Sequence, residues 1–251
     1  MSNARQNMIL LKGGLGNQLF QYSFFNLLRR NNLPIDGFYP DYQRDSYGRN
    51  IEINKFIEHM RIYSEIADRS SIFTSENFDA IRARLLSNTG NVVIKGYFQN
   101  FNYVKNSGIE EIVKTPKITQ ESTAMHIRRS DYGHNGVLPI KYYFEALKQL
   151  NNPNFVIFTD EPNFALYYFN KVPGLVNIFP SKSSNATSDF LHLCSYNSII
   201  MANSSYSWFA AYLAHAQRGS TIIAPSMWSL NGPGPGYSVE WRVIDTNLIV
   251  P

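Results

Sequence analysis

The chain has 251 residues, of which 44% are hydrophobic and 17% are charged, and its formal net charge is +4. This composition is typical of a globular protein with a buried core, and the length suits one large domain or two of about 120 residues. The small positive excess does not indicate a nucleic-acid-binding protein, which needs a dense Lys/Arg stripe. It suits an anionic ligand such as a nucleotide diphosphate, or a peripheral place at an anionic membrane surface.

One cysteine, Cys194, excludes an internal disulfide and predicts a reducing compartment. The apolar run before Lys12 is too short for the core of a signal peptide. No stretch approaches the roughly 20 apolar residues that a membrane-spanning helix needs. We therefore expect a soluble, cytoplasmic protein.

The first half of the chain begins with a predicted strand at residues 8–11, a glycine-rich turn and an amphipathic helix from Asn17 to Arg30. Residues 33–36 predict a second strand, and residues 39–75 give no clear pattern. A helix at 76–86 and an apolar strand at 91–95 follow.

The second half alternates short apolar strands with helices. Strands are predicted at 123–127, 155–158, 176–179, 198–201 and 221–224, and helices at 142–150, 162–170, 188–196 and from residue 203 to about 215. This alternation predicts an α/β fold with parallel sheets, whose ligands bind at the carboxyl ends of the strands. A polar stretch at 114–121 is the expected boundary between domains 1–118 and 119–251.

The first candidate site is the turn at residues 13–16. Glycines let the backbone approach a ligand closely, and the following helix points its first N–H groups at an anion. Gly14 and Gly16 supply two glycines of a dinucleotide-binding fingerprint, but Leu19 replaces the third, and Asp36 lies 20 residues after Gly16. An NAD(P)-binding oxidoreductase and a tight turn without any ligand both remain alternatives.

The second candidate site is the segment 126–132 (HIRRSDY) at the end of a predicted strand. The two-residue period of a strand places His126 and Arg128 on one side. A guanidinium group suits bidentate contact with a diphosphate, although two arginines beside Asp131 could also form a surface salt bridge.

The third candidate site is the helix start at residues 203–208 (NSSYSW), where hydroxyl and N–H groups can bind an anion. A plain helix cap with a buried aromatic face is the alternative. The sequence has no Asp-x-Asp motif and no His/Cys/Asp cluster at metal-ligand spacing, so we expect no metal. It also lacks the Walker A and Gly-x-Ser-x-Gly motifs.

Together, these segments resemble the bacterial α-1,2-fucosyltransferases of glycosyltransferase family 11. The resemblance covers nearly the whole chain, in family order, at residues 13–22, 96–99 (GYFQ), 126–132, 189–194 and 203–213. Ser130 stands where the family usually has glycine, Phe209 stands where a second tryptophan is common, and the chain is short for the family. The compact middle of the first half affects the identity of the acceptor more than that of the donor.

The resemblance implies a GT-B-like arrangement of two small Rossmann-like domains facing a cleft. Domain 1–118 would carry the glycine-rich loop and the acceptor side. Domain 119–251 would hold the donor, and its tail could return to the first domain. The implied activity is an inverting transfer of L-fucose from GDP-fucose to a galactose hydroxyl in α-1,2 linkage, in surface-polysaccharide or O-antigen synthesis. The enzyme would need no cofactor and would work in the cytoplasm, in peripheral contact with the inner membrane.

The resemblance also implies roles for single residues. Arg128 would contact the diphosphate and stabilise the departing GDP, and Asn17 would reach the donor or the acceptor. His126 and Asp189 would contact the guanosine, whereas Ser204, Ser205 and Tyr206 would bind phosphate. Further substrate contacts are expected from Gly14, Gly16, Gln18, Gln99 and Arg129.

The base that accepts the acceptor proton is left open among Asp131, His134, Asp160 and Glu161. Asp131 more readily orients Arg128 or Arg129, and a mechanism without a strong protein base is a further alternative. The rival functions are an NAD(P)-binding oxidoreductase, a non-catalytic sugar-binding protein, and a transferase with another GDP-sugar or a protein acceptor.

Overall fold

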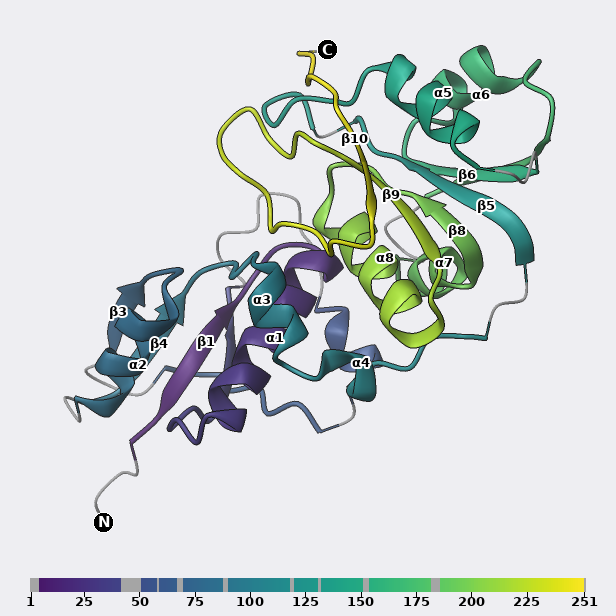
Figure 1. Ribbon diagram of the computed structural model, residues 1–251. Coiled ribbons are helices and arrows are strands. Elements are labelled where there is room, and N and C mark those ends of the chain that lie inside the picture. The colour runs from purple at the N-terminus through teal and green to yellow at the C-terminus, as the bar shows by residue number, and fades with distance from the viewer. Residues whose placement is uncertain are drawn as a thin grey trace. The chain divides into compact units, whose positions relative to one another are not determined.

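The computed structural model describes residues 5–41, 51–57, 59–66, 70–87, 90–117, 120–130, 132–150, 154–181 and 186–250. The chain divides into two compact units, Met1–Val113 and Lys114–Pro251. Each unit contains a parallel sheet with helices packed against it (Figure 1). We describe the two units separately, as unit 1 and unit 2.

The sheet of unit 1 is parallel throughout its described part, with the strand order β2-β1-β4-β3. Its strands are β1 (Asn7–Leu11), β2 (Gly37–Pro40), β3 (Ser71–Thr74) and β4 (Val92–Lys95). All five residues of β1 are buried, as expected for a central strand covered on both faces. This burial explains why β1 and β4 are continuous apolar runs, from which the sequence predicts both strands.

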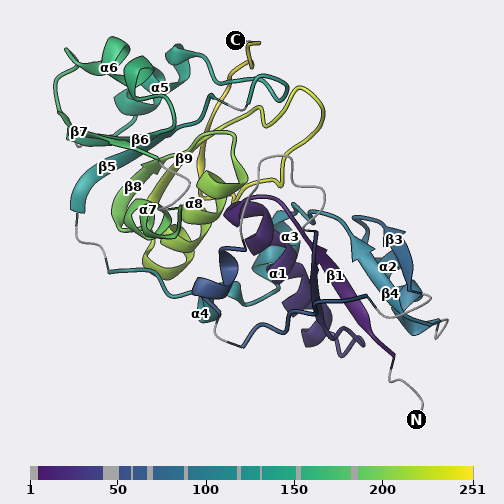
Figure 2. The same cartoon turned by 180° about the vertical axis from the view of Figure 1, so that it is seen from behind.

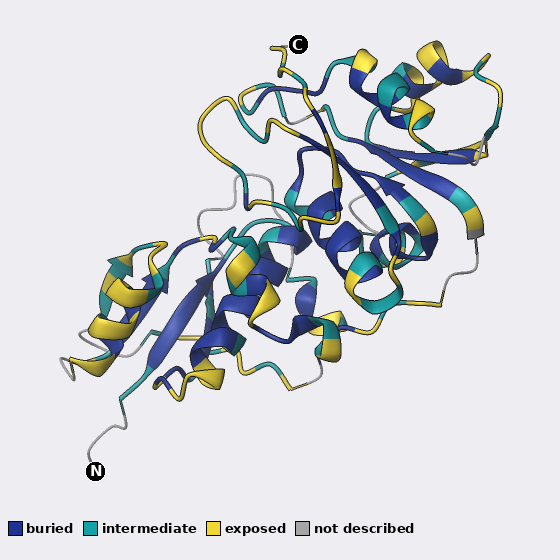
Figure 3. Ribbon diagram, in the orientation of Figure 1, coloured by how far each residue is buried: buried dark blue, intermediate teal, exposed yellow. Residues whose placement is uncertain are grey.

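The helices of unit 1 are α1 (Leu15–Arg30), α2 (Phe78–Leu86), α3 (Phe101–Lys105) and α4 (Ile109–Ile112), with a 3-10 turn η1 (Ile53–Lys55). The amide side chains of Asn77 and Asn100 cap α2 and α3 by accepting first-turn N–H groups. Most of α1 is buried, whereas α2 exposes one side to solvent (Figure 3).

The strand expected at residues 33–36 is wrong, because β2 begins only at Gly37. Asp36 lies just before β2, where its Oδ2 accepts the backbone N–H of Asn7 at 2.7 Å. Asn7 begins β1, whereas the glycine-rich turn follows the end of β1, roughly 15 Å away along the strand. Asp36 therefore lies at the amino ends of the strands, whereas the glycines lie at their carboxyl ends. This contradicts the dinucleotide-binding interpretation, which needs both at the carboxyl ends.

The sheet of unit 2 is also parallel in its described part, with the strand order β10-β9-β8-β5-β6-β7. Counted from β5 as the first strand, this is the Rossmann order 3-2-1-4-5-6. The strands are β5 (Gln120–Ile127), β6 (Phe155–Thr159), β7 (Leu175–Pro180), β8 (Tyr196–Ile200), β9 (Thr221–Pro225) and β10 (Arg242–Ile244). The tail, for which the resemblance allows a return to the first domain, contributes β10 to this sheet.

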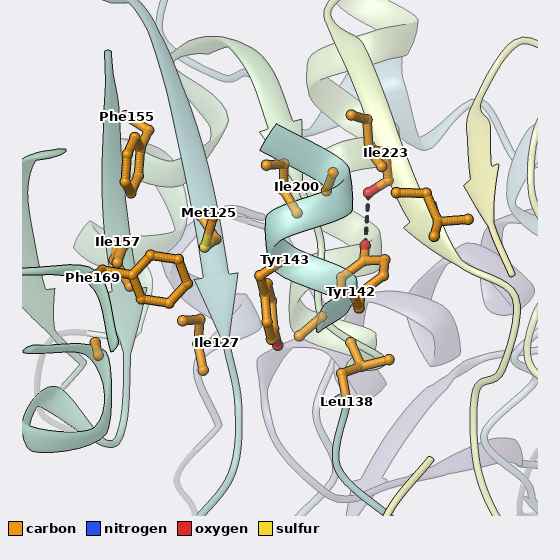
Figure 4. Packing of buried hydrophobic residues seen from close by; sticks show 14 residues of the cluster. Met125, Ile127, Leu138, Tyr142, Tyr143, Phe155, Ile157, Phe169, Ile200 and Ile223 are labelled. Atoms are coloured by element: carbon orange, nitrogen blue, oxygen red, sulfur yellow. Dashed lines mark hydrogen bonds between the residues drawn. The ribbon is translucent and has the colours of Figure 1, made fainter. Parts of the chain in front are cut away.

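The helices of unit 2 cover both faces of its sheet (Figures 1 and 2). One face carries α5 (Ile140–Lys148) and α6 (Pro162–Phe169), and the other carries α7 (Ala186–Cys194) and α8 (Ser205–Arg218). Met125 and Ile127 of β5 point toward α5 and α6, where they join a buried cluster (Figure 4). The intervening residue, His126, therefore faces α8.

Aromatic side chains attach the tail to unit 2. The buried Trp208 of α8 stacks on Tyr212 and lies with its ring centroid 5.8 Å from that of Trp241. Its indole N–H donates to the carbonyl of Gly236 at 2.8 Å. Within the described part of the chain, no helix combines the length and the apolar character needed to cross a membrane.

Candidate functional site

In unit 1, two predicted site residues meet at the carboxyl ends of the neighbouring strands β1 and β4. Asn17, in the first turn of α1, accepts a hydrogen bond at Oδ1 from Nε2 of Gln99, which follows β4, at 2.8 Å. Both side chains are half-buried. This amide pair leaves polar groups near the surface that could contact a sugar hydroxyl.

The glycines of the turn have different roles. Gly13 has φ +78, and a Cβ there would lie 2.7 Å from Nδ2 of Asn17, so the turn requires glycine at this position. Gly14 is the N-cap of α1 and provides no side-chain cap. Gly16 is buried in the first turn of the helix. The uncapped first turn keeps N–H groups that could face an anionic or hydroxyl ligand.

Gln18 was predicted to contact substrate, but its side chain is directed into unit 1. Its Nε2 donates to the carbonyl of Gly13 at 2.8 Å. Its Oε1 accepts the backbone N–H groups of Glu52 at 2.9 Å and Ile53 at 3.1 Å. Gln18 therefore fixes the glycine-rich turn against η1 and supports the site without being placed to bind a ligand.

The turn that follows β4 is strained. Phe98 has φ +56, which is uncommon for an aromatic residue. The carboxylate of Glu76 accepts the N–H groups of Tyr97 at 2.7 Å and of Phe98 at 2.5 Å. The ring of Phe98 stacks on Phe24, with the centroids 4.1 Å apart. These contacts hold the turn in the conformation that presents Gln99 to Asn17.

We predict that Glu76→Ala lowers the free energy of unfolding by about 1–2 kcal/mol, because two backbone N–H groups lose a charged acceptor. Urea unfolding followed by circular dichroism measures this effect. Glu76→Gln, which keeps one acceptor oxygen, is the matched variant and should lose about half as much. An unchanged midpoint in Glu76→Ala would contradict the role given to this carboxylate.

In unit 2, the predicted residues gather where the strand order reverses, between β5 and β8. Arg128 and Arg129 follow β5, and Ser204 and Ser205 lie at the start of α8, after β8. In open α/β sheets this reversal opens the crevice in which ligands bind. The fold thus places the arginine segment and the serine-rich helix start at one candidate site.

The carboxylate of Asp160, directly after β6, holds the segment after β5. Its Oδ1 accepts the backbone N–H of Arg129 at 3.0 Å. Its Oδ2 accepts the N–H of Ser130 at 3.2 Å and the hydroxyl of Ser130 at 2.6 Å. The same oxygen lies 3.2 Å from Nη1 of Arg128. The sequence suggests Asp160 only as a candidate base, and nothing in its neighbourhood predicts this structural role.

The two arginines differ in their surroundings. The Arg128 side chain is 27% exposed and forms an ion pair with Asp160, so it is held by a buried carboxylate and remains partly accessible. The Arg129 guanidinium packs over the ring of Phe164 in α6, 4.0 Å from the ring centroid. Asp131, expected to orient an arginine, lies outside the described residues, and Asp160 provides that contact to Arg128.

His126 is buried and uncharged at neutral pH. Burial and the neighbouring Arg128 lower its pKa to about 4, against a smaller opposing effect of Asp160. Among the described residues its Nδ1 has no hydrogen-bond partner. A neutral imidazole with an unpaired ring nitrogen can bind an uncharged polar group, as the proposed guanosine contact requires.

At the start of α8, the N-cap Ser204 makes no side-chain capping bond, so the first-turn N–H groups lack that partner. Tyr206 was expected to bind phosphate, but its hydroxyl donates to the carbonyl of Ala186 at 2.9 Å. Burial raises the pKa of Tyr206, and the nearby Asp189 raises it further. Tyr206 therefore connects α8 to α7, which carries Asp189, and its backbone N–H is the group left for an anion.

The family model described as Glycosyl transferase family 11 matches residues 1–233. The chain belongs to this family. A protein of Escherichia coli named O-antigen biosynthesis glycosyltransferase WbnK is 24% identical, over 87% of this chain and 93% of that protein. An E. coli alpha-1,2-colitosyltransferase is 28% identical, over 87% of this chain and 90% of its own length.

Solved structures confirm the GT-B-like α/β fold of this family 11 chain. E. coli ADP-heptose lps heptosyltransferase II aligns with a TM-score of 0.51 at 13% identity, covering 95% of this chain and 90% of that one. E. coli heptosyltransferase WaaC with ADP aligns with a TM-score of 0.53 at 11% identity, covering 96% and 93%. At such identities the likeness concerns the fold alone.

Asn203, beside the predicted phosphate-binding serines, connects three segments of the family 11 chain. Its Nδ2 donates to the carbonyls of Gly136 at 3.0 Å and Trp228 at 2.9 Å, and the residue is 1% exposed. Sequence analysis placed Asn203 in the helix-start segment without a role of its own. Its position directly before the N-cap Ser204 is the feature of the sequence that could have indicated one. Within the described ranges, no three His, Cys, Asp or Glu side chains are grouped so as to hold a metal ion.

We predict that Asn203→Ala lowers the free energy of unfolding by about 2 kcal/mol, since two carbonyls lose a shared buried donor. Thermal unfolding at fixed pH measures the loss. Asn231→Ala is the matched control, because Asn231 donates to the carbonyl of His134 at an exposed position. Equal losses in the two variants would contradict the role of Asn203 as a buried connection.

Proposed function

We propose that the protein is an inverting α-1,2-fucosyltransferase that moves L-fucose from GDP-fucose to a galactose hydroxyl of a glycan. The proposal rests on two features that lie where the strand order of this family 11 chain reverses. Arg128 follows β5 and is held by Asp160, and α8 begins without a side-chain cap. A guanidinium and a helix amino end both favour a diphosphate.

The chemistry would be a single displacement at the anomeric carbon of fucose. The bond from this carbon to the β-phosphate oxygen breaks as the acceptor oxygen attacks, and negative charge grows on the departing GDP. Arg128 and the first-turn N–H groups of α8 would stabilise that charge. They would take the place that a metal ion has in metal-dependent transferases. His126 and Asp189 would orient the guanosine.

The acceptor would be bound by unit 1, where Asn17 and Gln99 expose an amide pair. The acceptor hydroxyl must lose its proton, and His134 and Glu161 remain the described candidates for the base, beside Asp131. The hydrogen bonds already accepted by Asp160 argue against that residue as the base.

Colitose is a second candidate for the transferred sugar, because one relative carries the name alpha-1,2-colitosyltransferase. Colitose lacks one hydroxyl group that fucose has. A site that hydrogen-bonds that hydroxyl would reject the deoxy sugar by up to about 10⁴-fold. A site lined by apolar groups would accept both sugars.

A transfer assay tests these proposals. GDP-fucose and GDP-colitose are each incubated with the protein, EDTA and β-galactosides, and the product linkage is determined by NMR. We expect α-1,2-fucosyl galactoside, formed at a rate that EDTA does not change. Preferred transfer of colitose would assign the second sugar, and no transfer from either donor to any galactoside would overturn the proposal.

We also propose that the acceptor is a surface-polysaccharide repeat unit, reached from the cytoplasm at the inner membrane. The name of one relative, which refers to O-antigen biosynthesis, and the net charge of +4 support this. Co-sedimentation with vesicles containing anionic lipid, but not with neutral vesicles, is the expected result. Equal recovery with both kinds of vesicle would contradict the membrane contact.

A further inference from the structure

Asp160 is the residue on which the geometry of the arginine segment depends. Its side chain is 8% exposed, and its two oxygens accept two backbone N–H groups, one hydroxyl and one guanidinium contact. All of these donors lie within three consecutive residues, 128–130. A carboxylate with this set of partners ties the carboxyl end of β5 to that of β6.

One oxygen of this carboxylate makes most of the contacts. Oδ2 accepts hydrogen bonds from the N–H and the hydroxyl of Ser130, and it forms the ion pair with Nη1 of Arg128. A displacement of this oxygen would disturb all three contacts together. The carboxylate therefore couples the orientation of the guanidinium to the backbone that follows it.

We propose that Asp160 is the positioning residue for Arg128, fixing its guanidinium and the following backbone for contact with the donor diphosphate. This inference rests on the proposed function as far as the diphosphate is concerned. The inference that Asp160 fixes Arg128 is argued from the contacts above and needs no diphosphate. The ring of Tyr132, whose centroid lies 5.8 Å from Cζ of Arg128, is a second neighbour of the guanidinium. Asp160 acts through Arg128 and does not touch the reacting atoms.

Ser130 contributes to this arrangement through its side chain. Its hydroxyl forms the shortest of the contacts to Asp160, at 2.6 Å. A glycine would keep the backbone N–H contact and lose the hydroxyl contact. Ser130→Gly therefore weakens the support of Asp160 without removing any charge, and it is a mild variant that should fold even if stronger ones do not.

Arginine side-chain NMR tests the fixing of Arg128 without any donor. In the wild-type protein, restricted rotation of the guanidinium should give separate Nη signals, assigned through Arg128→Lys. We expect these signals to merge in Asp160→Asn and to broaden in Ser130→Gly. Asp245→Asn, which makes the same chemical change at an exposed position, is the control and should leave them unchanged. Separate signals that persist in Asp160→Asn would overturn the proposal.

A double-mutant cycle tests the consequence for transfer. We expect Asp160→Asn to lower kcat by roughly 100-fold, as a misplaced catalytic group does. In an Arg128→Ala background the same change should have almost no further effect, because Asp160 acts through Arg128. Added guanidinium ion should restore part of the activity of Arg128→Ala but not of the double variant. Additive losses, or equal rescue of both variants, would assign Asp160 a merely structural role.

The two proposals fail in different ways. If the wild-type protein neither binds GDP nor transfers fucose, the proposed function falls, while the NMR signals still decide whether Asp160 fixes Arg128. If the wild type transfers fucose and Asp160→Asn keeps both its kcat and its separate Nη signals, the positioning role falls alone.

Discussion

Replacing Arg128 with alanine is expected to lower kcat about 100- to 1,000-fold, as the loss of a charge-stabilising donor does in other enzymes. The reason is that Arg128 is held by Asp160 in an accessible orientation before any ligand arrives. A preoriented guanidinium acts mainly on the charge that develops on the departing GDP, so kcat should fall more than KM rises. Steady-state transfer kinetics with GDP-fucose measure both constants.

Two further variants make the result specific. Arg128→Lys keeps the charge but loses the planar, bidentate group, and it should lie between the wild type and Arg128→Ala. Arg82→Ala removes an exposed arginine from α2 and should change neither constant. A rise in KM alone in Arg128→Ala would mean that the residue binds donor and transition state equally, which contradicts the role proposed here.

Acid pH should destabilise the protein through His126. Its folded-state pKa of about 4 lies below the ordinary value near 6.5, because burial and Arg128 disfavour the charged ring. Between these two values the unfolded chain binds the extra proton, so the free energy of unfolding falls as the pH falls. The loss is about 1.4 kcal/mol per pH unit, or roughly 3 kcal/mol between pH 7 and pH 4.

Urea unfolding of the wild type and of His126→Gln at pH 7, 6 and 5 isolates this contribution from that of the carboxylates, which titrate in both proteins. The wild type should lose about 2 kcal/mol more than the variant between pH 7 and pH 5. His134→Gln, at an exposed histidine, should follow the wild type. Parallel pH profiles for the wild type and His126→Gln would show that the ring is not held neutral.

Much of the fold could be predicted from the sequence because both sheets are parallel and their central strands are buried. Such strands are continuous apolar runs, as in residues 155–158 and 221–224, and the helices between them have a clear period. The short elements were missed for a physical reason. Helices of four or five residues, such as α3 and α4, are too short to show a period, and β10 has only three residues.

The error at residues 33–36 has a different cause. Leu33 and Ile35 are apolar and buried, which predicts a strand, but they pack as part of the turn that leads into β2. Local hydrophobicity cannot distinguish a buried turn from a strand. The dinucleotide-binding alternative had another basis, the spacing of 20 residues between Gly16 and Asp36. A spacing along the chain does not specify at which end of β2 the carboxylate lies.

The candidate site was predictable where its residues follow strand ends directly. Arg128, Asn17 and Gln99 belong to segments that resemble the family, and the fold places each of them at the carboxyl edge of a sheet. The inward direction of Gln18 and of the Tyr206 hydroxyl was not predictable, since it depends on partners far away in the sequence. The role of Asp160 depends on the pairing of β5 with β6, which the sequence does not specify.

The most direct test of the account is a calorimetric titration of GDP and GDP-fucose, in EDTA, into the wild type and Arg128→Ala. We predict micromolar binding of GDP to the wild type without added metal, and binding at least tenfold weaker in Arg128→Ala, as the loss of a charge-assisted contact implies. Absence of binding of either ligand to a well-folded wild type, or equal affinity in the two proteins, would contradict the claim that Arg128 holds the diphosphate of a GDP-sugar donor.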